Sequence, residues 1–341
     1  MGQILIISGG ALSTIQDMGR IGYQKMGMSA AGVMDNYAAR CANILVGNPQ
    51  SAALIEAALL GPEIKFLAKS LVAVTGADMD AAINGVKIKA WKSYLVNKDD
   101  ILKLGGAKSG IRSYIAFSGG INIPPVMGSY ATYIKGGIGG MDGRPLKAGD
   151  ELNLKPAASQ GIREMDDTDI PAYGDNIVLR AVPGPFWEYF TEEGHELFFS
   201  QTYTVGARSD RMGIFLEGAP LSFKNETADI LSSAILMGSI QITNDATPVI
   251  LMADRQTTGG YAQIATVITP DLEKAAQAKP GAKINFQKVA VKEAQNIYTD
   301  YEKKIADIKA KLAFGAYAKS SRTQYLDLGD KIYKAIIEEV N

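Results

Sequence analysis

The stretch that decides the fold is LMADRQTTGGYAQIATVI, which runs from Leu251 to Ile268. Its apolar beginning extends back to Pro248 and predicts a buried strand, and the apolar run at 264–268 predicts the next strand. Between them, Asp254 to Thr258 carry an acid, a base, an amide and two hydroxyls. Gly259-Gly260 follow, where a backbone can turn sharply or approach a ligand closely. Such groups between two buried strands indicate either a binding site on a rigid scaffold or a loop whose polar groups satisfy one another.

The same alternation of short apolar runs with Gly, Asn, Asp and Pro recurs along the chain, which contains 36 glycines. It is typical of many short strands, so we expect a mainly β fold with minor helices. Strands are expected at 4–7, 72–75, 114–117, 177–182, 235–242, 249–252 and 284–286.

Helices are predicted in four places. Segments 31–45 and 51–60 are expected to be helical, with Pro49 as the breaker between them, and 185–193 is a candidate for a short helix. The apolar spacing of 291–312 predicts a long amphipathic helix. Beyond it, 324–337 suggests a hairpin with its turn at Gly329-Asp330.

A polar, acidic and proline-containing stretch at 162–174 is typical of a linker between domains. We therefore expect an N-terminal half at 1–165, a second half at 175–290 and a tail at 291–341. The tail is expected either to contact a partner or second copy, or to fold back onto the second half.

Bulk properties narrow the class of protein. A chain of 341 residues with 47% hydrophobic and 21% charged residues is typical of a soluble globular protein. Its net charge of -1 gives no reason to expect nucleic acid or an anionic membrane as partner. No run approaches the roughly 20 apolar residues of a membrane span, so a cytoplasmic protein is expected. A single cysteine, Cys41, and a single histidine, His195, argue against a metal site; we expect Cys41 to be buried and His195 to lie at the surface or in a turn.

Three acids stand close to arginines: Asp17 near Arg20, Asp210 beside Arg211, and Asp254 beside Arg255. Each pair would either bind a substrate carboxylate or phosphate through the guanidinium or form a structural ion pair. The Gly105–Ser109 segment fails the phosphate-loop signature, because Ala107 stands where a glycine is needed before Lys108. No independent ATP site is expected in this chain.

The whole set of motifs, in this order and spacing over roughly residues 3 to 295, resembles the allophanate hydrolase subunit 2 family, also described as biotin-dependent carboxyltransferase-like. This resemblance implies two cyclophilin-like β-barrel halves. The motifs that carry it, besides the stretch at Asp254, are Ser13–Gly27, Ala31–Asp35, Ala42–Asn48, Phe117–Ile121, Met127–Tyr133, Gly139–Asp150, Pro183–Pro185 and Ser209–Gly213.

The resemblance implies the C-type subunit of an ATP-dependent 5-oxoprolinase, working with an A-type subunit and a B-type subunit that resembles allophanate hydrolase subunit 1. ATP would be used by the complex. One alternative is a carboxyltransferase subunit that moves CO2 from carboxybiotin to a urea or amide nitrogen. Another is a non-catalytic regulator that binds a kinase-inhibitor-like B-type subunit. A homo-oligomer also remains open.

The site residues follow from the same motifs. The expected catalytic residues are Asp254, Arg211 and Gln256, and no metal is expected. The sequence departs from the family pattern at Tyr130-Ala131, Phe215 and Ser233, which bears on the substrate. The expected substrate-binding residues are Arg20, Asp17, Ser129, Arg255, Thr257, Thr258, Gly259, Gly260 and Tyr261.

Overall fold

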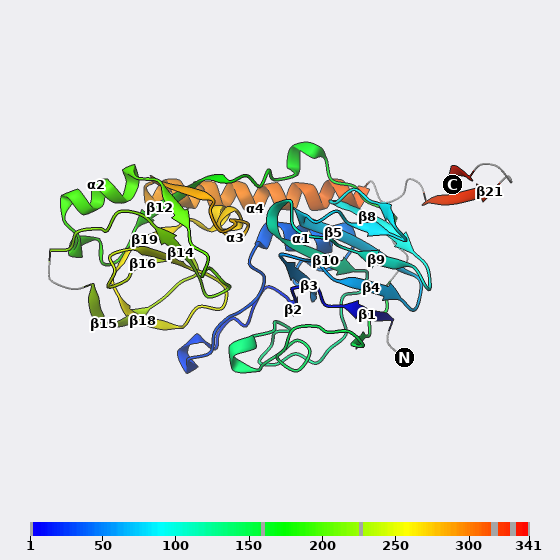
Figure 1. Cartoon of the computed structure of the whole chain (residues 1–341), viewed down its shortest axis with the longest axis horizontal. Helices are drawn as coiled ribbons and strands as arrows, with labels where there is room; N and C mark the ends of the chain where they lie inside the picture. The colour runs from blue at the N-terminus through cyan, green and yellow to red at the C-terminus, as the bar shows by residue number, and fades with distance from the viewer. Residues whose placement is uncertain (1–2, 158–160, 225–227, 315–319, 328–331, 340–341) are drawn as a thin grey trace.

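A computed structural model describes residues 3–157, 161–224 and 228–314, together with the strands at 320–327 and 332–339. Figure 1 shows two β-rich halves side by side, the first blue to cyan and the second green to yellow, with a long orange helix lying along both. The mainly β architecture expected from the sequence is confirmed. Within the described ranges, no helix has the length and apolar character that a membrane crossing requires.

Two sheets form the first half. Alternate residues of a strand point to opposite faces, so Val72 and Val74 enter the core between the sheets while Leu71 and Ala73 face helix α1 (Asn36–Leu45). One sheet has the order β11 (Glu151–Leu152), β1 (Ile4–Ser8), β4 (Glu63–Phe66), β9 (Ile101–Lys103), β6 (Ala82–Ile83), β7 (Val86–Lys87). The other has the order β2 (Leu12–Gln16), β3 (Leu54–Ala58), β10 (Ser109–Phe117), β5 (Ser70–Asp78), β8 (Lys92–Val96).

The second half contains a closed barrel, which confirms the barrel expected there. Met34, from the first half of the sequence, is fully buried in the core of this barrel. The barrel order is β12 (Asn176–Pro183), β19 (Gln263–Val267), β16 (Ser239–Ile242), β17 (Pro248–Leu251), β14 (Gly213–Glu217), β13 (Tyr203–Val205), β20 (Lys283–Lys288). A separate ribbon pairs β15 (Asp229–Ala234) with β18 (Thr258–Tyr261).

Three helix predictions need correction. The segment 51–60 is not helical: it contains β3, a fully buried strand paired with β2 on one side and β10 on the other. Its Leu, Ala and Glu residues suit a helix, but pairing on both sides overrides that propensity. The predicted helix at 31–45 begins only at Asn36, and 185–193 holds the short 3-10 helix η4 (Trp187–Tyr189) and the start of α2 (Glu192–Ser200).

The long helix predicted near the end of the chain is α4 (Val291–Phe314). It does not fold back onto the second barrel alone, because its Ile305, Ile308 and Leu312 join the apolar core around α1. Arg40 of α1 also forms a two-bond ion pair with Glu302 at 2.7 Å. The hairpin is confirmed as β21 (Ser320–Asp327) and β22 (Ile332–Glu339), while its predicted turn at Gly329-Asp330 lies outside the described residues.

Cys41 is buried, as predicted, and its burial raises the pKa of its thiol. The prediction for His195 is wrong: it lies in α2, only 6% exposed. Its ring stacks on Trp187 at 3.6 Å, and its Nε2 lies 2.8 Å from the Trp187 carbonyl oxygen. Trp187, which precedes α2, therefore covers the imidazole.

Asp35 connects α1 to the rest of the molecule. Its carboxylate caps the helix by accepting from the Ala38 N–H at 2.9 Å. It also accepts from the Tyr173 hydroxyl and from Gln277 Nε2, each at 2.8 Å. Gln277 follows the short helix α3 (Leu272–Ala276) of the second half. One carboxylate therefore joins the first half, the linker and the second half.

Replacing Asp35 by Ala should lower the free energy of unfolding by about 2–4 kcal/mol, because a cap is lost and two buried donors lose their acceptor. The matched control is Thr191→Ala at the N-cap of α2, where the Gly194 N–H and the exposed Ser222 hydroxyl lose the Thr191 side chain as partner. That change should cost about 1 kcal/mol. Equal losses in urea unfolding would show that Asp35 acts as an ordinary cap.

Candidate functional site

Arg211 forms a buried ion network between the two halves. Its Nε and Nη2 donate to the carboxylate of Asp254 at 3.0 and 2.8 Å, and its Nη1 donates to Glu56. A second bond from Nη2 reaches the Gly32 carbonyl oxygen at 2.6 Å. Burial acts to lower the pKa of Arg211, but the charges of Glu56 and Asp254 outweigh it and raise that pKa. The guanidinium is therefore permanently charged, and it is bonded to two carboxylates and one carbonyl oxygen.

Local structure positions the three charged groups. Arg211 precedes β14, and Asp254 follows the neighbouring strand β17. The Asp254 N–H donates to the Arg211 carbonyl oxygen at 2.8 Å, which fixes the two residues side by side. Glu56 lies in the middle of β3 and also accepts from the Met34 N–H at 2.8 Å. Two strands of the barrel thus meet a central strand of the first half.

A second polar cluster lies in the first half around Asp17. Its carboxylate accepts from the Gly19 N–H at 2.8 Å, the Ser129 hydroxyl at 2.7 Å and the Tyr130 N–H at 2.7 Å. Arg20 is fully buried and donates to two carbonyl oxygens of the same loop, those of Val126 at 3.0 Å and Ala131 at 2.9 Å. The cluster pins the loop that follows β2 to the loop around Ser129.

The two clusters meet at the contact between the halves. Burial lowers the pKa of Arg20, while the charges of Asp17 and then Asp254 act against that shift. Asp254 of the second half is therefore close enough to act on a guanidinium of the first. The Ser29 hydroxyl also reaches the Ala253 carbonyl oxygen at 3.4 Å. The structure thus brings together Asp17, Arg20, Ser129, Arg211 and Asp254, which the sequence places far apart.

Arg255 points away from this contact. Its guanidinium donates to the carbonyl oxygens of Met252 at 3.2 Å and Ile235 at 3.4 Å, and burial lowers its pKa. Asp210 accepts from the Met212 N–H at 2.7 Å. The predicted pairings of neighbours, Asp210 with Arg211 and Asp254 with Arg255, are therefore wrong, because Arg211 lies in a bend and Asp254 in a turn, and each side chain bonds to other partners. The actual pair is Arg211 with Asp254.

The other predicted residues form an accessible edge beside the network. Gln256 and Thr258 are exposed, and Thr257 and Tyr261 are half-buried. The expected sharp turn at Gly259-Gly260 is instead part of strand β18. The backbone of Gly259 packs closely against the chain's own side chains, since a Cβ there would lie 2.6 Å from Ile235 Cδ1 and 2.7 Å from Gln241 Nε2. The edge offers one amide, hydroxyls and backbone groups for binding a small polar molecule.

Glu56 was not among the predicted site residues. The sequence does contain a signal for it. Glu56 is the one charged residue in the apolar run 52–60, and a carboxylate buried with that run requires a partner. In the described part of the chain, no group of three or more His, Cys, Asp or Glu side chains could hold a metal ion. The groups of this site act through hydrogen bonds and charge, and they are arranged around the guanidinium of Arg211.

The chain belongs to the family described as carboxyltransferase domain, subdomain A and B, which it matches over residues 26–288. It is 36% identical over 304 residues to the C subunit of the Haemophilus influenzae 5-oxoprolinase, covering 87% of this chain and 96% of that protein. The C subunit of the Escherichia coli 5-oxoprolinase is 34% identical over 303 residues, covering 87% and 95%.

A solved structure shows the same fold. The crystal structure of the Kluyveromyces lactis urea carboxylase superposes with a TM-score of 0.86 at 29% identity, covering 89% of this chain. The matched region is 29% of the urea carboxylase chain, so this chain corresponds to one part of that larger protein.

Gly259 gives a local test of the accessible edge. Changing it to Ala should displace the buried Ile235 and Gln241 side chains and lower the free energy of unfolding by about 1–3 kcal/mol. Gly260→Ala is the matched control, because the nearest atom to its new Cβ would lie at 3.5 Å, an ordinary contact. Thermal unfolding of the two variants would contradict this packing if Gly260→Ala were the more damaging change.

Proposed function

We propose that this chain is the C-type subunit of an ATP-dependent 5-oxoprolinase, which hydrolyses 5-oxoproline to glutamate together with A-type and B-type subunits in the cytoplasm. The match that carries this proposal covers nearly the full length of two proteins named as the C subunit of 5-oxoprolinase, at 36% and 34% identity. Because both relatives are named as subunits, the match supports a role within a larger complex.

The geometry of the site supports a shared active site. Arg211 and Asp254 satisfy each other in the buried network, so in the free chain they position the edge of β18. Gln256 and Thr258 are exposed and available to bind the polar lactam or its ring-opened product. His195 is covered by Trp187 and Cys41 is buried, so neither offers a nucleophile. We infer that a B-type subunit docks beside β18 and supplies the missing groups.

ATP is not expected to bind this chain itself. The glycine-containing segment at 105–109 lacks the phosphate-loop pattern, and its Lys108 forms an ion pair with Asp80. ATP hydrolysis supplies the driving force for opening an amide, which is a poor electrophile. This chain's part is to hold the lactam through directed donors at a fixed position.

A glutamate-release assay on the co-expressed A-type, B-type and present chains tests the proposal. Glutamate formation from 5-oxoproline and ATP should require all three chains. Gln256→Ala should reduce kcat/KM by about tenfold or more, which corresponds to the loss of one useful hydrogen bond. The complex should still assemble, as judged by size-exclusion chromatography.

Gln287→Ala is the matched control, because Gln287 is an exposed glutamine on β20 away from the edge. It should leave kcat/KM unchanged. A stable three-chain complex that releases no glutamate would refute the hydrolase assignment. Activity of the present chain alone would refute the shared site.

The structural likeness to urea carboxylase favours one second candidate, a carboxyltransferase subunit that uses carboxybiotin from another protein. Transfer of label from bicarbonate to urea or another amide, with no glutamate formed, would select that function.

A further inference from the structure

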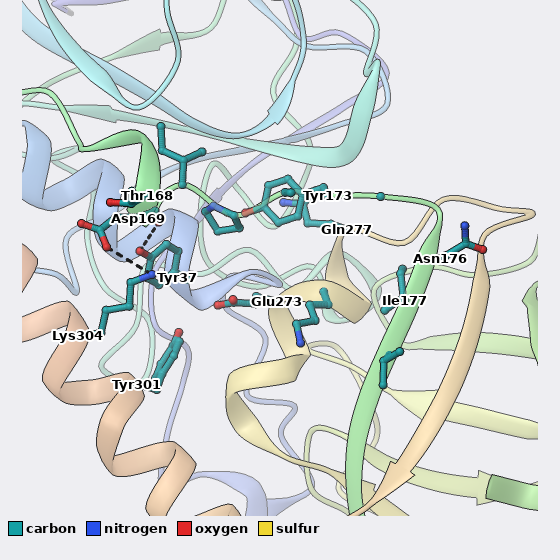
Figure 2. A pocket seen from close by; sticks show the side chains of 16 residues that line it. Tyr37, Thr168, Asp169, Tyr173, Asn176, Ile177, Glu273, Gln277, Tyr301 and Lys304 are labelled. Atoms are coloured by element: carbon teal, nitrogen blue, oxygen red, sulfur yellow. Dashed lines mark hydrogen bonds and ion pairs between the residues drawn. The ribbon is translucent and has the colours of Figure 1, made fainter. Parts of the chain in front are cut away.

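A cavity of about 520 Å³ lies on the side of the molecule where α1, α3, α4 and the linker meet. Figure 2 shows its walls: Tyr37 comes from α1, Tyr173 from the linker, Glu273 from α3 and Tyr301 from α4. We call this cavity the junction pocket. None of the residues predicted for the site from the sequence lines it.

Glu273 is the unusual group of the junction pocket. Its Oε2 is buried and has no hydrogen-bond partner within the described part of the chain. The two nearby lysines bind other carboxylates: Lys274 lies 2.9 Å from Asp271, and Lys304 lies 3.5 Å from Asp169. Asp35 lies behind Glu273. It accepts hydrogen bonds from neutral groups only: the Ala38 N–H, the Tyr173 hydroxyl and the Gln277 amide. Among the described residues that line the pocket, Glu273 is therefore the carboxyl group to which no cation is bonded.

Aromatic rings form the wall beside this carboxyl group. The rings of Tyr37 and Tyr301 lie 6.1 Å apart, and both tyrosines line the pocket. Lys304 Nζ lies 5.3 Å from the centre of the Tyr37 ring, so a cation already sits over one of these faces. Aromatic faces beside a carboxylate are a known means of holding an organic cation.

We propose that the junction pocket binds a small molecule with an alkylammonium group, with Glu273 as the counter-charge and the Tyr37 and Tyr301 rings as walls. The ammonium group can come from a free amine or from an amino acid. In the second case the carboxylate of the amino acid would share Lys274 or Lys304, which line the pocket, with Asp271 or Asp169. This inference does not rest on the proposed 5-oxoprolinase activity.

Protonation of Glu273 should govern this binding. Burial raises its pKa to about 8, from an ordinary value of 4.5, and the charge of Asp35 adds to the effect. At neutral pH the free pocket therefore holds a proton, which a bound cation would displace. The other charged and titratable groups around Glu273 are Asp35, Asp271, Lys274, Asp169, Lys304, Arg180, Cys41, Tyr37, Tyr173 and Tyr301.

Isothermal titration of the full chain with n-butylammonium and with norvaline tests the proposal. At least one should bind, and affinity should rise several-fold between pH 6 and pH 8 as Glu273 ionises. The probe itself stays charged, because the pKa of an alkylammonium lies near that of lysine, about 10.4. Tighter binding of norvaline would identify an amino acid as the source, and tighter binding of butylammonium a free amine.

Glu273→Gln should remove binding of both cations without unfolding the protein. Because the folded-state pKa of Glu273 is raised, ionising it costs stability as pH rises through about 8, and the neutral amide avoids this cost. The variant should therefore melt no earlier than the wild type at pH 8.

Glu196→Gln, an exposed position on α2, is the matched control and should bind both probes as the wild type does. The neutral alcohol 1-pentanol should not show the pH dependence. The proposal is wrong if neither cation binds up to about 10 mM. It is also wrong if Glu273→Gln binds them as well as the wild type does.

Discussion

The contact between the two halves depends on one guanidinium group, that of Arg211. Its acceptors come from three segments that are distant in the sequence: Asp254 after β17, Glu56 in β3 and the Gly32 carbonyl oxygen. A charge removed from water is tolerated only when it is fully paired, and loss of one partner leaves the others buried without compensation. The arrangement of these segments is therefore constrained more tightly than apolar packing alone would require. Met34, whose N–H donates to Glu56, extends this contact into the core of the barrel in the second half.

The same contact presents different surfaces on its two sides. On one side, the edge of β18 exposes Gln256 and Thr258 beside the buried network, where a polar substrate can be held by fixed donors and acceptors. On the other side, Asp35 and Gln277 connect α1, the linker and α3 around the junction pocket. Figure 1 shows α3 and α4 together, with β15 and β18 at a distance from them in the second half.

Much of the fold follows from local sequence patterns. The spacing of Ile305, Ile308 and Leu312 predicts α4, and the short apolar runs predict most barrel strands, because both signals are periodicities of side-chain burial. The strand β3 escapes such reasoning, since all five of its residues are buried and no alternation remains. For the site, the sequence identifies Arg211 and Asp254 but not their pairing, which depends on the register of β14 against β17. The burial of Arg20 and the partner role of Glu56 likewise depend on how the halves meet, which no local pattern encodes.

The most direct test of this account is a double-mutant cycle between Glu56 and Arg211, which lie in different halves. The free energy of urea unfolding would be measured for the wild type, Glu56→Gln, Arg211→Met and the double variant. If the guanidinium holds the halves together, the two changes should be strongly coupled, by about 2–3 kcal/mol, because each single change leaves buried charge unpaired. Additive losses, within about 0.5 kcal/mol, would show that the contact between the halves does not depend on this ion network.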